Sequence, residues 1–257
     1  MPNKSGNSQP LHITTYNIHK GFSQFNRQMM VHELRKRLRE LNPDIVFLQE
    51  VQGLHLGHAG NHDNWPRIPQ HEFLAEETWQ DAAYGCNMIY DHGHHGNAIL
   101  SRFPILHSHN QDVTHLHFEK RGMLHCQIEM PKGPVAHCVC VHLSLFGYSR
   151  RKQISALAAY LDELTDPTAP LIVAGDFNDW RNHVGDQLSR SLGLREVFSN
   201  HRGTPVRSFP ASLPMFRLDR IYIRGFDVSH TEVHHGPPWS SISDHAALSA
   251  HLMQHGR

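Results

Sequence analysis

The stretch that decides the fold is Leu171-Ile172-Val173-Ala174-Gly175-Asp176-Phe177-Asn178, a short apolar run that ends in a glycine and two polar side chains. Four consecutive apolar residues bounded by a turn signal predict a strand buried on both faces, over residues 171–174. Gly-Asp-x-Asn is also good turn sequence, so Asp176 and Asn178 alone indicate no more than a turn. The stretch gains weight because the same arrangement recurs along the chain.

Polar side chains mark the ends of several other predicted strands. Asn17 lies in the first strand, at residues 11–18, Glu50 ends the strand at 44–50, and His142 ends the one at 135–142. Asp219 opens a strand that includes residues 221–223, and Ser243-Asp244-His245 precedes the last strand, at 246–252. Functional residues of α/β folds gather on loops at one end of the sheets, so we expect these side chains to lie together.

The order of the elements indicates the architecture. Amphipathic helices are predicted at residues 29–41 and 149–164, and further strands at 85–90, 97–101 and 123–130. Strands often follow one another without an intervening helix, which does not fit a regular βαβ winding. An α/β fold of two mixed sheets packed together, with helices outside, is the better prediction. We find no internal repeat and no dividing linker, so a single domain is expected over residues 11–257, after a flexible N-terminus at 1–10.

Composition and charge exclude some classes of protein. The chain has 257 residues, 39% of them hydrophobic, and its 24 basic residues balance its 24 acidic residues. This composition is typical of a soluble globular protein, and the balance disfavours a tight, nonspecific DNA binder, which needs a broad basic surface. The polar start is not a signal peptide, and no apolar run approaches the roughly 20 residues of a transmembrane helix. The expected location is the cytoplasm.

The cysteines and the 25 histidines show no metal-binding spacing. The four cysteines lack a CxxC pair, and three of them lie in strand-like runs, which predicts free, buried thiols rather than a disulfide framework. A zinc cage would need fixed Cys or His spacings. Many of the histidines stand among Gly, Asp, Asn and Pro and are predicted to lie in loops: His55, His58, His62, His94, His95, His234 and His235.

Six ordered motifs carry a resemblance to a known family. They are Thr15-Tyr16-Asn17-Ile18, Leu48-Gln49-Glu50-Val51, Gly96-Asn97-Ala98-Ile99-Leu100-Ser101, Gly175-Asp176-Phe177-Asn178, Leu218-Asp219-Arg220-Ile221 and Ser243-Asp244-His245. Together they resemble the endonuclease/exonuclease/phosphatase superfamily over nearly the whole chain. Two longer segments are most similar in sequence to the bacterial YbhP-like subgroup: Asn17-Ile18-His19-Lys20-Gly21-Phe22 and Gly175-Asp176-Phe177-Asn178-Asp179-Trp180.

The resemblance implies a four-layer α/β/β/α sandwich with its active site at one edge of the paired sheets. It also implies a Mg²⁺ site in which Glu50 is the principal ligand, with Asn17 and Asp244 completing it directly or through water. Mg²⁺ is a hard ion that takes one or two carboxylates and keeps several waters, so an amide–carboxylate site suits it better than Zn²⁺. Mn²⁺ is a possible substitute.

The same resemblance assigns the reacting groups. Asp219 and His245 resemble the family's Asp–His pair, in which a carboxylate on one imidazole nitrogen raises the basicity of the other. Asp176 is the rival base, and the choice between them stays open at this stage. Asn178 and His142 would donate hydrogen bonds to the phosphate in the transition state. The implied reaction is in-line attack by water on phosphorus, with no covalent intermediate.

Three further residues are candidates for substrate binding, each with a plain structural alternative. Arg121 reaches phosphate or is a solvated turn charge. Asn97 lines the site or is a satisfied strand-edge amide. Trp180 stacks on a base or on an apolar part of the substrate, or it packs against the Asp–Asn loop. The cations Arg150-Arg151-Lys152 begin a helix, where the macrodipole disfavours them, so an anionic ligand there is a minor alternative to a solvated face.

The predicted activity is hydrolysis of phosphate esters, most simply of a phosphodiester, and the substrate is open because one fold hosts many activities. The candidates are phospholipids or other small phosphodiesters, inositol phosphates and nucleic acids, the last of which would make the chain a DNA or RNA nuclease. A catalytically silent scaffold is the alternative from another class. Several aromatic residues that flank the motifs would suit an apolar rim for a lipid: Phe146, Tyr148, Trp180, Phe209, Phe216 and Trp239.

Overall fold

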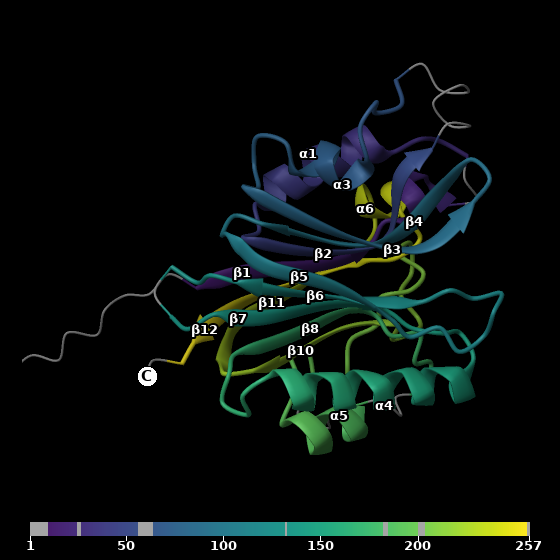
Figure 1. Ribbon diagram of the computed structural model, residues 1–257. Coiled ribbons are helices and arrows are strands. Elements are labelled where there is room, and N and C mark those ends of the chain that lie inside the picture. The colour runs from purple at the N-terminus through teal and green to yellow at the C-terminus, as the bar shows by residue number, and fades with distance from the viewer. Residues whose placement is uncertain are drawn as a thin grey trace, which may run out of the picture.

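The computed structural model describes residues 10–24, 27–55, 64–131, 133–181, 185–199 and 204–255. The terminus at residues 1–10, predicted to be flexible, lies outside these ranges except for Pro10. The described chain folds into two stacked six-stranded sheets with helices on both outer faces (Figure 1). This arrangement confirms the predicted α/β/β/α sandwich and the single domain.

The first sheet has the strand order β11-β12-β1-β2-β4-β3. Its central pair, β1 and β2, is parallel, and the remaining neighbours are antiparallel. The bounds of its strands are β1 (Leu11–Asn17), β2 (Ile45–His55), β3 (Asp81–Tyr90), β4 (Gly93–Ser101), β11 (Phe226–His234) and β12 (Ala247–Gln254).

The second sheet repeats this plan with the order β5-β6-β7-β8-β10-β9. Here β7 and β8 form the parallel pair among otherwise antiparallel neighbours. The bounds are β5 (Ile105–Asp112), β6 (Gly122–Ile128), β7 (Ala136–His142), β8 (Leu171–Asp176), β9 (Arg195–Glu196) and β10 (Asp219–Arg224).

Helices cover the outer face of each sheet (Figure 1). The helices α1 (Val31–Leu41), α3 (Gln70–Ala75) and α6 (Trp239–Ile242) pack on the first sheet, and α4 (Gly147–Leu164) and α5 (Gly185–Leu192) pack on the second. A short 3₁₀ turn, η1 (His19–Gly21), follows β1. Between the sheets lies a third apolar cluster with residues from both, such as Ile13 and Phe47 from the first and Cys138 and Ile172 from the second.

The two parallel pairs place their polar residues at one edge of the sandwich. Each pair is joined by a crossover through a helix, α1 between β1 and β2 and α4 between β7 and β8. The carboxyl ends of all four strands therefore meet at the same edge. Strands β10 and β12 run antiparallel to their neighbours, so their first residues reach this edge too. This edge is opposite the described end of β12 (Figure 1).

Three edge strands and several histidines differ from the prediction. β5, β9 and β11 were not predicted, because β9 has only two residues and the sequences of β5 and β11 are polar and mostly exposed, as suits sheet edges. The loop assignment was wrong for His55 in β2, for His94 and His95 in β4, and for His234 in β11. In each case pairing with a neighbouring strand outweighs the local turn-forming composition. His58 and His62 lie outside the described residues.

The thiols follow the prediction. The four cysteines are free, with Cys126, Cys138 and Cys140 buried and Cys86 exposed. No helix among the described residues is long and apolar enough to cross a membrane.

Candidate active site

A cavity of about 330 Å³, here called the edge cavity, lies at the edge where the strand ends meet. Its lining includes most of the predicted site residues and several that were not predicted. The lining residues are His19, Lys20, Glu50, His95, Arg121, His142, Leu145, Asp176, Asn178, Trp180, Phe209, Leu218, Asp244 and His245.

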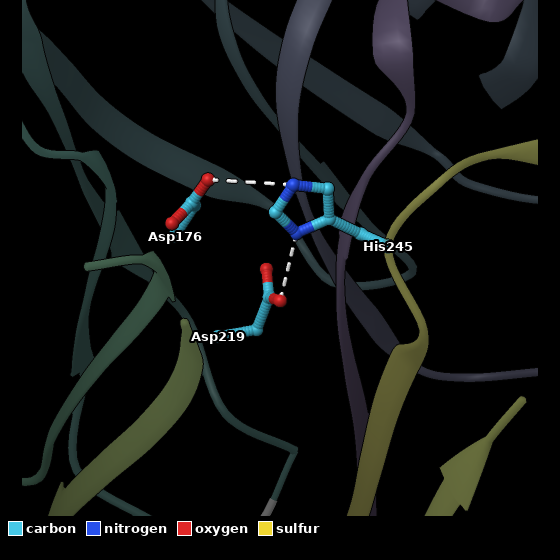
Figure 2. Close-up of side chains that lie close together, drawn as sticks. All are labelled: Asp176, Asp219 and His245. Carbon is cyan, nitrogen blue, oxygen red and sulfur yellow. Dashed lines mark hydrogen bonds and ion pairs between the residues drawn. The ribbon is translucent and has the colours of Figure 1, made fainter. Parts of the chain in front are cut away.

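Strand register sets three of the polar groups in one row across the second sheet. His142 at the end of β7 pairs with Asp176 at the end of β8, and Asp176 pairs with Asp219 at the start of β10. His245 reaches this row from the loop before β12. Figure 2 shows its ring between the two carboxylates. Its Nδ1 lies 2.8 Å from Asp219 Oδ2, and its Nε2 lies 3.8 Å from Asp176 Oδ2.

Asp176 is the centre of the polar network. Its Oδ2 accepts a hydrogen bond from Asn17 Nδ2 at 3.2 Å and lies 3.5 Å from His142 Nε2. Its Oδ1 accepts the backbone N–H of Asn178 at 2.9 Å, the turn predicted from the Gly-Asp-x-Asn sequence. The side-chain amide of Asn178 donates to the Leu143 carbonyl at 2.9 Å, which ties the β8 loop to the β7 loop. Both Asp176 and Asn178 are buried.

Burial and neighbouring charges separate the pKa values of the site. Burial, together with the charge of Asp219, raises the pKa of Asp176 to about 6. Burial opposes the charged form of His245, but the carboxylates of Asp219, Asp176 and Asp244 outweigh it and raise the pKa of His245 to about 10. Burial, helped by Arg121, lowers the pKa of His142 well below its usual value. Of these two histidines, His142 is therefore neutral and His245 protonated at neutral pH.

A second group of carboxylates faces the cavity from the first sheet. Asn17 Nδ2 lies 3.4 Å from Glu50 Oε1, and Asp244 Oδ1 lies 3.3 Å from His19 Nδ1. The Asn17 amide oxygen accepts the backbone N–H of His19 at 3.1 Å, so its nitrogen points at the carboxylates. Hard oxygen donors on the cavity wall fit a divalent cation such as Mg²⁺. Glu50 and Asp244 are the side chains that would hold it, and Asn17 orients Glu50.

A tighter cluster of potential ligands is present in Asp176, Asp219 and His245, whose nearest atoms all lie within 4.8 Å of one another. Within this cluster the Asp219–His245 hydrogen bond occupies His245 Nδ1, and Asp176 accepts the Asn17 amide and the Asn178 N–H.

The backbone is strained around the cavity. Six non-glycine residues in the described chain have positive φ, and four of them line the cavity: His19 (45°), Lys20 (58°), Glu50 (56°) and Asn178 (48°). Such conformations cost about 1–3 kcal/mol each and tend to cluster at functional sites. The register between β2 and β4 shifts at Glu50, which turns its carboxylate to the cavity.

The three candidate substrate-binding residues have different environments. Arg121 lines the cavity and pairs with Glu119 at 3.1 Å. Trp180 also lines it, is 44% exposed, and packs edge-on against Phe216. Asn97 is buried between the sheets, where its amide donates to the carbonyls of Gly122 and Cys140 at 3.0 and 3.3 Å. The amide nitrogen thus fits the structural alternative of a satisfied amide, whereas the Asn97 side-chain oxygen is buried with no hydrogen-bond partner among the described residues.

A buried ionic cluster supports the β8 loop from behind. Asp179, one residue past Asn178, is fully buried, with Arg150 Nη2 at 3.8 Å and Arg220 Nη2 at 3.6 Å. Arg220 also donates to the Asp179 carbonyl at 3.0 Å. Arg150 therefore serves the interior rather than an external anion, whereas Arg151 and Lys152 are exposed.

Sequence reasoning did not assign a role to five of the lining residues: His19, Lys20, His95, Leu145 and Leu218. His19 and Lys20 follow Asn17 directly, so their position after the first strand was the available signal. His95 is brought in by the pairing of β4 with β2 and β3, which no local pattern reveals.

Comparison with known proteins supports the same family. Residues 14–245 match the model of the Endonuclease/Exonuclease/phosphatase family. The chain is 46% identical over 241 residues to the Escherichia coli K12 protein YbhP, covering 93% of this chain and 95% of that one. The chain therefore belongs to the endonuclease/exonuclease/phosphatase family. Within it, the chain is a member of the YbhP-like subgroup.

Solved structures share the fold at low sequence identity. An endonuclease/exonuclease/phosphatase from Beutenbergia cavernae superposes with a TM-score of 0.76 at 18% identity, over 97% of this chain and 72% of that one. The human Nocturnin catalytic domain superposes at 0.71 and 18% identity, over 96% and 95%. The mannosyl-6-phosphatase Bt3783 of Bacteroides thetaiotaomicron superposes at 0.69 and 15% identity, over 95% and 99%. Family members act as phosphoesterases or nucleases, and they generally use a divalent metal.

Proposed function

We propose that this chain is a divalent-metal-dependent phosphodiesterase that hydrolyses its substrate with an activated water and forms no covalent intermediate. The observation that carries the proposal is the meeting, in one cavity, of carboxylates beside the first sheet with His142 and Asp176 of the second. Glu50 and Asp244 line the same cavity as His142 and Asp176, and His245 reaches it from the loop before β12. A phosphate ester bridging the two groups would have its metal ligands on one side and its proton acceptor on the other.

Glu50 and Asp244 would hold the metal, with Mg²⁺ the natural ion and Mn²⁺ a substitute. The bound ion supplies charge neutralisation and orientation of the phosphate. Asn17 keeps Glu50 and Asp176 at a fixed separation, since its amide nitrogen contacts both carboxylates.

We assign the proton acceptor to Asp176. Its pKa of about 6 leaves it ionised at neutral pH and still basic enough to accept a proton from water. His245, held as an imidazolium by Asp219, is suited to stabilise negative charge rather than to act as a base. The ascending limb of the pH profile of kcat/KM should persist in His245→Gln and vanish in Asp176→Asn. Loss of that limb in His245→Gln alone would assign the base to the Asp219–His245 pair.

We propose that His142 and Asn178 donate hydrogen bonds to the phosphoryl oxygens in the transition state. The lowered pKa of His142 keeps its ring neutral, so it donates from one nitrogen without adding a charge that would compete with the metal. Removing one such donor typically lowers kcat by about 10²–10³-fold. Arg121 supplies a fixed positive charge to the same cavity.

The deciding experiment is hydrolysis of bis-p-nitrophenyl phosphate with Mg²⁺ or Mn²⁺ by wild type and by His245→Ala. We expect metal-dependent turnover that falls by orders of magnitude in the variant. Absence of turnover, or equal turnover in His245→Ala, contradicts the enzymatic assignment and favours a silent scaffold. Plasmid DNA, RNA, phospholipids and inositol phosphates, tested under the same metal condition, distinguish a nuclease from the other phosphoesterases.

A further inference from the structure

Exposed apolar side chains gather around the mouth of the edge cavity. Twelve large hydrophobic residues of the described chain are exposed, and eight of them lie in segments that flank this cavity. Soluble proteins rarely expose contiguous apolar patches, and such patches mark sites of contact with partners or membranes. Single exposed leucines scattered over a surface need no explanation. A group of exposed apolar side chains around one cavity does need one.

One group, here called the α4-side rim, lies where the chain enters α4. It consists of Phe118, Leu145, Phe146 and Tyr148, which are 71%, 55%, 50% and 58% exposed. Leu145 lines the cavity, and the Phe118 ring meets the Phe146 ring edge-on at 5.9 Å. Glu119 accepts the Leu145 N–H at 3.0 Å and so joins the two loops that carry the rim.

The other group, here called the Trp180-side rim, consists of Trp180, Leu213, Met215 and Phe216, which are 44%, 69%, 51% and 36% exposed. Trp180 lines the cavity and packs at 4.7 Å against Phe216. The Met215 N–H donates to the carbonyl of Phe209, another lining residue, at 2.8 Å. Both rims thus connect directly to the cavity wall.

Positive charges accompany the apolar rims although the whole chain is neutral. Lys20 and Arg121 line the cavity. Arg151 and Lys152 lie 6.0 and 5.8 Å from the centre of the exposed Tyr148 ring. Apolar and aromatic side chains beside Lys and Arg are the combination that binds the interface of an anionic bilayer.

We infer that the two rims dock this chain on the surface of a bilayer that contains anionic phospholipid, so that the edge cavity faces the headgroups and takes its phosphate ester from a lipid. This inference rests on the proposed phosphodiesterase function and names the substrate class. Aliphatic Leu145, Leu213 and Met215 suit acyl chains and provide no flat face for stacking on bases. A nucleic acid would also need a longer track of phosphate-binding cations.

The test is cosedimentation with vesicles of phosphatidylcholine alone and of equal parts phosphatidylcholine and phosphatidylglycerol. Wild type should bind the mixed vesicles and bind phosphatidylcholine alone more weakly. Phe118→Ser with Phe146→Ser should weaken binding to the mixed vesicles by at least about tenfold, because the bilayer would no longer bury part of these two rings. Arg151→Ala with Lys152→Ala should reduce the preference for the mixed vesicles. The matched control is Leu106→Ser with Leu164→Ser, two exposed leucines at the opposite edge, which should bind as wild type does.

The same preparations are assayed on bis-p-nitrophenyl phosphate, and their folding is checked by circular dichroism. Turnover of this soluble diester without vesicle binding overturns docking and leaves the phosphodiesterase proposal standing. Vesicle binding without turnover of soluble diester or lipid supports docking and overturns the phosphodiesterase proposal. Equal loss of vesicle binding in the rim and control variants also overturns docking. A single-stranded oligonucleotide that binds wild type but not the Phe118→Ser, Phe146→Ser variant would assign the rims to nucleic acid instead.

Discussion

At the scale of single residues, the site depends on how each carboxylate is placed relative to water and to its partners. Asp176 and Asp219 both meet His245, yet only Asp219 holds it at hydrogen-bond distance, 2.8 Å against 3.8 Å. Among the described residues no cation forms an ion pair with Glu50, which turns to the cavity through a strained backbone. Asp219 thus fixes a histidine, whereas Glu50 keeps its carboxylate free of such a pair within the described chain.

Glu50→Gln should weaken metal activation. The substitution keeps the size and shape of the side chain but removes the negative charge that would bind the metal. Asn17 then contacts an amide instead of a carboxylate. Loss of a partner outside the ligand shell already lowers metal affinity by about 10–100-fold, so we expect the half-saturating Mg²⁺ concentration to rise by more than that. The measurement is a Mg²⁺ titration of turnover, with metal binding followed by calorimetry. Glu40→Gln, at a surface pair with Arg37, is the control. An unaltered titration in Glu50→Gln would move the metal site elsewhere.

Glu196, remote from the cavity, should make folding stability depend on pH. Burial raises its pKa from 4.5 to about 7, although Ser199 donates to it at 2.9 Å. The folded state then binds the proton more tightly than the unfolded state. Protonation of Glu196 therefore contributes fully to the stability of the folded state below pH 4.5. This contribution is lost as the pH rises to about 7.

Glu196→Gln removes this dependence, so at pH 8 it should be more stable than wild type by about 1–3 kcal/mol. The difference should shrink towards pH 5. Urea denaturation at both pH values measures it, with exposed Glu129→Gln as the control. If the free energies of unfolding of Glu196→Gln and wild type differed by the same amount at both pH values, the raised pKa of Glu196 would be contradicted.

At the scale of elements, the turn after β8 carries the site and is supported from both sides. Gly175 has φ of +147°, and a Cβ there would lie 1.9 Å from the Val141 carbonyl oxygen, so only glycine allows β7 and β8 to approach this closely. Behind the turn, Asp179 lies between the buried guanidinium groups of Arg150 and Arg220. The turn is thus held by close strand packing in front and by a buried ion cluster behind.

Asp179→Asn should destabilise the fold strongly, because it leaves two buried guanidinium groups without their shared countercharge. Breaking a buried ion pair in this way costs about 3–5 kcal/mol. Asp227→Asn removes the partner of Arg195 at an exposed pair and should change the free energy of unfolding by less than about 1 kcal/mol. Urea denaturation of both variants provides the comparison. Equal effects of the two substitutions would show that the cluster does not hold the turn.

The sequence predicted the elements with strong apolar runs and missed those whose residues face water. The strand predicted at residues 171–174 is observed as β8 (Leu171–Asp176), and the helix predicted at 29–41 as α1 (Val31–Leu41). The edge strands β5 and β11 are defined by pairing with β6 and β12, and their composition alone resembles loops. Likewise, His95 reaches the cavity because β4 is paired with β2 and β3. Contacts of this kind depend on tertiary pairing, which no local pattern contains.

At the scale of the whole molecule, the cavity exists only where both sheets are in place. Asn17 and Glu50 come from the first sheet, whereas His142, Asp176 and Asp219 come from the second. Buried polar contacts join the sheets close by: Gln49 Nε2 lies 3.2 Å from Cys140 Sγ, and Asn97 donates to the Cys140 carbonyl. The apolar cluster between the sheets also draws on both. Neither sheet buries its inner face without the other, so the two should fold as one unit.

We therefore expect a single cooperative unfolding transition, and the chain carries separate reporters for its two sheets. Trp65, Trp79 and Trp239 lie on the side of the first sheet, and Cys126, Cys138 and Cys140 are buried in the second. Burial raises the pKa of the Cys126 and Cys140 thiols to about 12, so labelling requires the second sheet to move away from the first. A Cys86→Ser, Trp180→Phe variant removes the exposed thiol and the tryptophan that follows β8 of the second sheet. In this variant, pulsed thiol labelling and tryptophan fluorescence along a urea series should give the same midpoint. Thiols that become reactive before the fluorescence changes would show instead that the two sheets separate before the first sheet unfolds.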